Sequence, residues 1–167
     1  MDTVEHREMN TETADVIARP PLLFLAALAL GFIADHLLPL PFPIARPGTA
    51  HWLSAFLASS MVVIGLAVAG AGIRSFTRAG TPVPGNQPVR ALVTTGIHGW
   101  SRNPIYVGML LLYLGIGLLV RSPWILLLAL PLAITIRFGV IAREEAYLER
   151  RFGNDYQAYR ARVRRWI

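Results

Sequence analysis

The chain contains no cysteine and no lysine among its 167 residues. Without cysteine there is no disulfide framework, no thiolate nucleophile and no cysteine-ligated metal site. Without lysine, chemistry through a Schiff base at a lysine amine is excluded. Charged residues are also scarce, at 16% of the chain, whereas hydrophobic residues make up 54%. Any ionic site must therefore be built from arginine, histidine and a few acidic residues.

The hydrophobic residues fall into four long runs, and this pattern predicts an all-α membrane protein with four transmembrane helices. The runs cover residues 21–40, 52–73, 105–120 and 124–142. The second run carries no charge and, at 1.5 Å per residue, spans roughly 33 Å, which is enough to cross a bilayer. The third and fourth are separated only by residues 121–123, as in a tight helical hairpin. Residues 1–167 read as a single domain.

The arginines predict the orientation of these helices. The connection over residues 74–103 and the region after Ala142 hold most of the arginines, whereas the short loops over residues 41–51 and 121–123 carry one each. The positive-inside rule then makes both termini and the middle connection cytoplasmic. We expect a multi-pass protein of a bacterial inner membrane. The net charge of +6 is explained by this topology, so no nucleic-acid partner is expected.

Both ends of the chain differ in composition from the apolar runs. The acidic segment over residues 1–19 lacks the basic start of a secretory signal and is expected to be a flexible tail. After Ala142, apolar residues recur every three or four positions, which predicts an amphipathic helix interrupted at Gly153. This helix is expected to lie in the head-group region or to pack on the protein's own loop. Its apolar positions are Leu148, Phe152, Tyr156, Tyr159, Val163 and Trp166.

Two polar blocks stand out against this apolar background. The first, GIHGWSRNPIYVG over residues 96–108, runs directly into the third apolar segment, and the second is REEAYLERRFG over residues 143–153. Unpaired polar groups are costly at a bilayer boundary. The two blocks therefore indicate a charged pocket against the membrane that can hold a small ionic molecule. Clustered small residues over 65–72 favour close helix packing rather than a nucleotide-binding loop, because no strand precedes them.

These blocks resemble a known family. LVTTG over residues 92–96 with SRNPIYVG over residues 101–108 looks like the signature loop of the isoprenylcysteine carboxyl methyltransferase and phospholipid methyltransferase superfamily. EEAYL over residues 144–148, followed by Phe152, Gly153, Tyr156, Tyr159 and Val163, resembles that superfamily's C-terminal block. The resemblance covers residues 78–166. It implies an integral-membrane enzyme that binds S-adenosylmethionine without a Rossmann domain, in a cytosolic pocket closed by the C-terminal helix. A lipid-like substrate would enter from the bilayer.

The resemblance and the chemistry of the cofactor together single out the binding residues. Residues at positions matching the family's cofactor contacts are Leu92, Val93, Asn103, Pro104, Ile105, Tyr106 and Glu144, with Arg90 just before them and His98 where relatives often carry tyrosine. Glu144 or Glu145 can pair with the ammonium of S-adenosylmethionine. Arg90 or Arg102 can meet its carboxylate, preferably in bidentate geometry. We expect no metal site, because the four histidines show no ligand spacing.

The acceptor is left open by the sequence. In some relatives an arginine four residues before the glutamate contacts the substrate, but here that position is Val140, so Arg137 or Arg143 is expected to replace it. Methyl transfer needs alignment and no protein nucleophile, although an amine acceptor needs a Glu, such as Glu145, or a His to remove a proton. A prenylated cysteine carboxylate, a phospholipid amine and a small thiol all remain possible acceptors. Alternatives of another class are a small four-span transporter and a non-catalytic scaffold.

Overall fold

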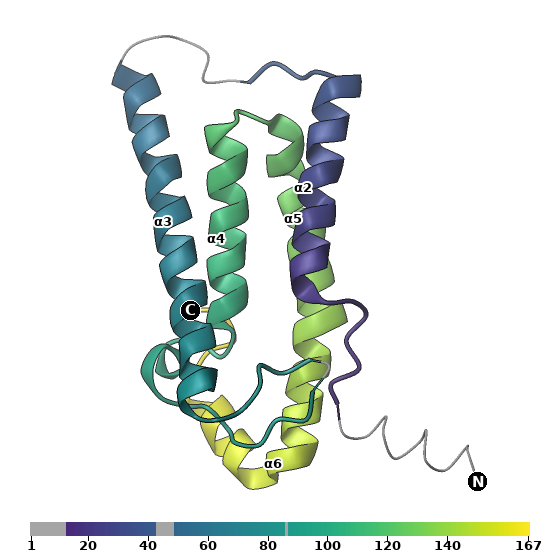
Figure 1. Ribbon diagram of the computed structural model, residues 1–167, viewed down its shortest axis with the longest axis vertical. Coiled ribbons are helices and arrows are strands. Elements are labelled where there is room, and N and C mark those ends of the chain that lie inside the picture. Colours follow the sequence, from purple (N-terminus) through teal and green to yellow (C-terminus); the bar gives the residue numbers. More distant parts are fainter. Residues whose placement is uncertain (1–12, 43–48, 86) are drawn as a thin grey trace, which may run out of the picture.

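The computed structural model describes residues 13–42, 49–85 and 87–167. Within these ranges the protein is helical and has no strand, which confirms the predicted all-α fold. Four helices stand side by side (Figure 1). They are α2 (Pro20–Leu37), α3 (Thr49–Arg78), α4 (Pro104–Leu119) and α5 (Pro123–Thr135). The 3-10 helix η1 (Gly96–Gly99) precedes α4, and the π-helix η2 (Ile136–Ile141) joins α5 to α6 (Ala142–Arg162).

All four predicted apolar runs fold as helices. Three helices of the described chain are long and apolar enough to cross a membrane: Pro20–Leu37, Trp52–Arg78 and the continuous helix that starts at Pro123. α4 is equally apolar but has only 16 residues, or about 24 Å at 1.5 Å per residue. Its neighbours α3 and α5 belong to helices that are long enough to cross a bilayer, so α4 is the short member of the bundle.

Close packing of α3 against α4 depends on glycine. These two helices form the most extensive helix–helix contact among the described residues. A Cβ atom added to Gly108 would lie 2.5 Å from the Ala69 nitrogen and 2.6 Å from the Gly65 oxygen, which no other residue could tolerate. Small residues are the usual means by which helices approach in a membrane. The glycine-rich stretch of α3 therefore serves helix packing, as predicted, at least at Gly65.

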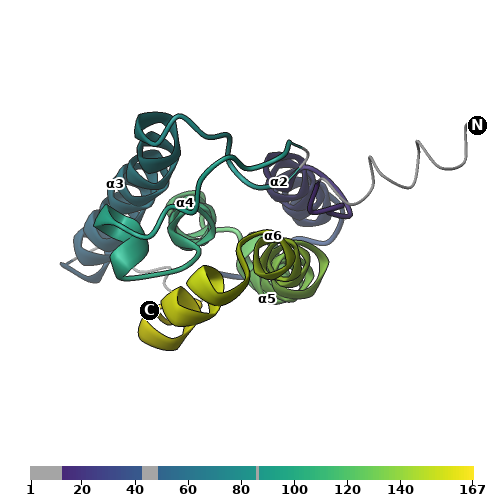
Figure 2. The same cartoon turned by 90° about the horizontal axis from the view of Figure 1, so that it is seen from below.

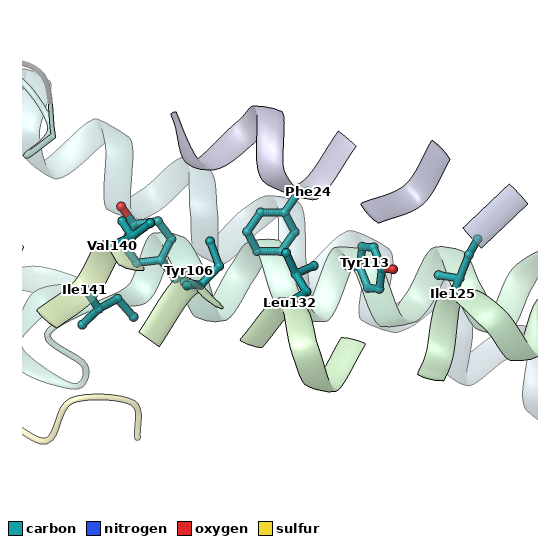
Figure 3. Packing of buried hydrophobic residues seen from close by; sticks show 8 residues of the cluster. Phe24, Tyr106, Tyr113, Ile125, Leu132, Val140 and Ile141 are labelled. Atoms are coloured by element: carbon teal, nitrogen blue, oxygen red, sulfur yellow. The ribbon is translucent and has the colours of Figure 1, made fainter. Parts of the chain in front are cut away.

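The core of the bundle is a column of buried side chains between α2, α4, α5 and η2 (Figure 3). It consists of Phe24, Tyr106, Tyr113, Ile125, Leu132, Ile136, Val140 and Ile141. The Phe24 and Tyr113 rings meet edge to face with centroids 6.2 Å apart. The outer faces of the helices are also apolar, and Phe56, Leu130 and Phe138 are each more than 60% exposed. An apolar exterior around an apolar core is what a bundle needs in order to sit in hydrocarbon.

The connections divide between the two ends of the bundle. Residues 13–19, the connection from α3 to α4, and α6 all lie at one end (Figure 1). The turn between α4 and α5 lies at the other end, where the Ser122 hydroxyl caps α5 by accepting a 2.9 Å hydrogen bond from the Ile125 N–H. This arrangement brings both polar blocks of the sequence to the same end.

The predicted flexible tail over residues 1–19 does not hold for residues 13–19. The Ala14 N–H donates to the Gly85 carbonyl at 3.1 Å, and Arg143 Nη1 donates to the Asp15 carbonyl at 2.7 Å. Ala14 is also buried, against Val89 and Tyr147. Residues 1–12 of the predicted tail lie outside the described residues.

α6 is the amphipathic C-terminal helix, and it bends at Gly153 as predicted. Gly153 adopts φ 49° and ψ −121°, a conformation that side-chain-bearing residues avoid. Beyond the bend, the second half of α6 leaves the axis of α5 and runs across the lower end of the bundle (Figure 2). The helix therefore forms a wall beneath α4 instead of continuing away from the membrane.

Candidate functional site

A pocket lies at this end of the bundle, where the signature loop meets α6. Its wall includes Leu92, Val93, His98, Arg102, Asn103, Pro104, Ile105 and Tyr106 from the first polar region, and Glu144, Glu145, Leu148, Tyr156 and Tyr159 from α6. Phe76, Val83, Pro84, Val89 and Ala91 complete it. The cavity between these side chains has a volume of about 40 Å³, so the walls of the pocket lie close together. Two segments about forty residues apart thus share one cavity.

Glu144 is the buried acid of this pocket. It lies in the first turn of α6 with 5% of its surface exposed, and it accepts a 2.7 Å hydrogen bond from the Tyr106 hydroxyl. Glu144 lies beyond the apolar span, which ends with η2. Burial raises the pKa of its carboxyl to about 8, the Tyr106 hydroxyl lowers that pKa, and the nearby Glu145 raises it. A cationic group in the pocket would therefore find a carboxyl that lacks a charged partner of its own.

Glu145 has a different environment although it is the next residue. Arg165 Nε lies 3.0 and 3.1 Å from its two carboxylate oxygens, and Arg165 Nη2 lies 2.6 Å from Oε2. Arg102 Nη2 is 3.2 Å from its Oε1. Two guanidinium groups therefore neutralise Glu145, and bidentate pairs of this kind are among the stronger polar contacts in proteins. Glu145 acts as the junction that joins the signature loop, α6 and the C-terminal segment (residues 163–167).

Arg102 gives only part of its hydrogen-bonding capacity to Glu145. Its side chain is 8% exposed, and its Nε and Nη1 atoms are buried without a hydrogen-bond partner among the described residues. Buried donors of a charged group are costly to leave unpaired. Arg102 therefore has two nitrogens, Nε and Nη1, that could donate to an anionic atom in the pocket.

Asn103 and His98 both line the pocket, and both make contacts with other segments of the chain. Asn103 immediately precedes α4, and its side-chain amide donates to the Arg165 carbonyl at 3.0 Å. His98 packs edge to face on Phe76 with ring centroids 4.9 Å apart, and the Tyr159 hydroxyl donates to its backbone carbonyl at 2.7 Å. Burial lowers the pKa of His98 to about 4, so its ring is neutral at pH 7. Its Nδ1 has no hydrogen-bond partner in the part of the chain that the structure describes.

Three of the arginines expected at the site lie elsewhere. Arg90 lines a separate hollow with Thr81 and Gln87, because residues on either side of it face the pocket and successive residues of an extended chain alternate. Arg143 is exposed, and its guanidinium is bonded to Asp15.

Arg137 stacks on its neighbour Phe138, with the guanidinium 5.2 Å from the ring centroid. Seven residues separate Arg137 from Glu144, and such residues share a face in a regular α-helix. Here the wider turns of η2 lie between the two and change that register. Neither Arg137 nor Arg143 lines the pocket.

Several residues that build the site are not evident from the sequence. Tyr147 orients the loop, because its hydroxyl accepts a 3.0 Å hydrogen bond from the Val89 N–H. Tyr156 and Tyr159 belong to the predicted apolar stripe of the C-terminal helix, and both face the cavity. Arg165 has the sequence context of a surface arginine in a basic tail. No local signal marks it, because its partner Glu145 is twenty residues away.

The chain is similar in sequence to a known family and to a bacterial protein. A protein from Haemophilus influenzae (strain ATCC 51907 / DSM 11121 / KW20 / Rd), described as an uncharacterized protein, is 59% identical over 27 residues. The match covers 16% of this chain and 43% of that protein, so this chain spans less than half of the relative's length. No solved structure matches. The sequence model of the family described as phospholipid methyltransferase matches residues 53–155, which include α3, α4, α5 and the start of α6. The chain belongs to the phospholipid methyltransferase family.

Proposed function

We propose that this protein transfers the methyl group of S-adenosylmethionine to a lipid-like acceptor at the membrane surface. The observation that carries the proposal is that an acidic and a basic side chain, each with unused hydrogen-bonding capacity, line the same pocket. Among the described residues Glu144 has no cationic partner, while Arg102 has two nitrogens, Nε and Nη1, without a hydrogen-bond partner. The amino-acid end of S-adenosylmethionine is a zwitterion and would satisfy both, with its ammonium on Glu144 and its carboxylate on Arg102.

The remaining wall suits the rest of that molecule. Tyr106, Tyr156 and Tyr159 present aromatic surface, which attracts a cation such as a sulfonium and can also pack on adenine. His98 is neutral and offers its unpaired Nδ1 to a polar edge of the base. Leu92 and Val93 supply apolar contacts. The positions that the family resemblance assigned to the cofactor therefore include both charged and apolar contacts of the right kind.

When bound, S-adenosylmethionine supplies a methyl group that an acceptor's lone pair takes by in-line displacement as the carbon–sulfur bond breaks. The protein's part is to hold the two molecules in line and to exclude water. Correct alignment alone can lower a barrier by roughly 7–11 kcal/mol. Glu144 and Arg102 would fix one end of the cofactor, and α6 closes the pocket from below. This mechanism needs no protein nucleophile.

An amine is favoured over a carboxylate as the acceptor. Within the described chain, Arg102 is the one arginine that lines the pocket, and the proposal uses it for the cofactor. A carboxylate acceptor would then lack a cation, because Arg137 and Arg143 lie elsewhere. An amine-bearing phospholipid head group requires none, but its ammonium must first release a proton to solvent so that the nitrogen lone pair can take the methyl group. This preference agrees with the name of the matched family.

The test is methyl transfer by the purified protein in vesicles. Methyl-labelled S-adenosylmethionine is supplied with vesicles containing phosphatidylethanolamine, and in parallel with a farnesylated cysteine analogue and a small alkyl thiol. We expect label in the phospholipid, and at least tenfold less with Glu144→Gln, since a charge-assisted contact is lost. Arg160→Gln is the matched control, because Arg160 pairs with Glu149 at 3.3 Å on the exposed side of α6. Label in none of the three acceptors, with no binding of S-adenosylhomocysteine, would favour a transporter or scaffold.

A further inference from the structure

Arg165 sets how Arg102 is shared between the protein and a ligand. Glu145 is 7% exposed, and three of its contacts come from Arg165 whereas one comes from Arg102. An ionised carboxylate has about four acceptor positions. With Arg165 in place these positions are nearly filled, so Arg102 gives only its Nη2 to Glu145. Its Nε and Nη1 have no hydrogen-bond partner within residues 13–42, 49–85 and 87–167.

Removal of the Arg165 side chain would change this division. Glu145 would then be a buried carboxylate with Arg102 as its one cation among the described residues. A buried charge gains most when it is fully paired, and arginine pairs best with a carboxylate in bidentate geometry. The Arg102 guanidinium would therefore turn toward Glu145 and present fewer N–H groups to the pocket.

The backbone near Arg165 is held independently of its side chain. Its carbonyl accepts hydrogen bonds from the Asn103 amide at 3.0 Å and the Ser101 hydroxyl at 3.4 Å. The adjacent Arg164 carbonyl accepts one from the Arg102 N–H at 3.0 Å. A side-chain substitution leaves these three bonds available. The C-terminal segment should therefore stay in place when the Arg165 guanidinium is lost.

We propose that Arg165 is a positioning residue, which saturates Glu145 and thereby keeps the free edge of Arg102 available for the carboxylate of the methyl donor. This inference rests on the proposed function and adds a ligand specificity to it. The pocket should distinguish adenosine thioethers that carry an α-amino-acid end from those that do not, and Arg165 should be needed for that distinction.

The experiment compares two ligands by calorimetric titration of the full chain in detergent. S-Adenosylhomocysteine carries the carboxylate, whereas 5′-methylthioadenosine keeps the adenosine and thioether but lacks it. For Arg165→Met we expect the affinity for S-adenosylhomocysteine to fall about tenfold, the usual effect of losing a charge-assisted contact. The affinity for 5′-methylthioadenosine should stay within about twofold. Arg160→Met, at the exposed pair with Glu149, should change neither affinity.

A second substitution tests whether Arg165 acts through Glu145. In Arg165→Met combined with Glu145→Gln, Arg102 no longer has a charged competitor, so the affinity for S-adenosylhomocysteine should return toward that of the unmodified protein. Failure of this rescue would overturn the inference, as would equal losses for both ligands or no loss in Arg165→Met. If the unmodified protein binds no S-adenosylhomocysteine at millimolar concentration, the proposed function itself fails.

Discussion

Glu144 and Glu145 are adjacent identical residues whose surroundings give them different chemistry. Glu145 is neutralised by two guanidinium groups, while the one hydrogen bond to Glu144 from the described side chains comes from the Tyr106 hydroxyl. The sequence could place both in the first turn of a helix after the last apolar run. The sequence alone could not show which of the two is neutralised by arginine, because their partners come from positions 38 and 20 residues away.

Binding of the cofactor product should release a proton from Glu144. The pKa of Glu144 is raised to about 8, so at pH 6.5 its carboxyl is mostly protonated in the free protein. A ligand ammonium favours the ionised form, and the proton leaves. Titration with S-adenosylhomocysteine at pH 6.5 in buffers of different ionisation enthalpy should show close to one proton released, and none with Glu144→Gln. Affinity should accordingly rise between pH 6 and 8. Equal apparent enthalpies in all buffers would contradict this assignment.

His98 should make the fold sensitive to mild acid. Its pKa falls from 6.5 to about 4 in the folded protein because burial disfavours the imidazolium. Between these values the unfolded chain binds a proton that the folded protein does not, so stability is lost as the pH falls below 6.5. At pH 5.5 the loss should be about 1 kcal/mol.

Thermal unfolding in detergent at pH 7.5 and 5.5 measures this effect. His98→Gln serves as the control, since it removes the titrating ring and leaves the other acid-sensitive groups. The original chain should lose more stability on acidification than this variant does. Identical losses would show that His98 does not titrate as its burial requires.

At the scale of the elements, the helices could be predicted from the sequence far better than their junctions. Long apolar runs located every apolar helix, with its ends within five residues of those predicted when α5 is taken together with η2, and Gly153 marked the bend of α6, because both signals are local. No local signal in the sequence marks the π-helix over Ile136–Ile141. Arg137 lies within it, and its wider turns change the register between Arg137 and Glu144. Arg90 lines a separate hollow for a similar reason, since the side toward which a residue of an extended segment faces depends on contacts such as that of Val89 with Tyr147.

The bend at Gly153 should be necessary for stability. Gly153 has φ 49° and ψ −121°, and a Cβ atom added there would meet no other atom within 4 Å, so Gly153→Ala introduces backbone strain without a steric clash. We expect destabilisation of about 1–3 kcal/mol, the usual cost of such a conformation. Gly70→Ala is the matched control, because Gly70 lies in α3 with nothing within 4 Å of the added carbon, and alanine favours a helix. Equal melting temperatures for the two variants would refute the role of the bend.

At the scale of the whole molecule, the bundle gathers its polar segments at one end (Figure 1). The arginine distribution predicts that this end faces the cytoplasm. Because the chain has no cysteine, single cysteines can report the topology without background. Gln87→Cys and Ala158→Cys should react with a membrane-impermeant maleimide in inside-out vesicles and not in intact cells. Pro41→Cys, at the opposite end, should show the reverse, and labelling of all three from one side would contradict the topology.

The central claim is that the signature loop and α6 together enclose the methyl donor. Ultraviolet crosslinking of methyl-labelled S-adenosylmethionine to the membrane-bound protein, followed by peptide mapping, tests it most directly. The account predicts that label enters peptides from residues 89–106 and 144–159 and disappears in excess S-adenosylhomocysteine. Label that is confined to residues 20–37 or 107–135, or that excess S-adenosylhomocysteine does not remove, would contradict it.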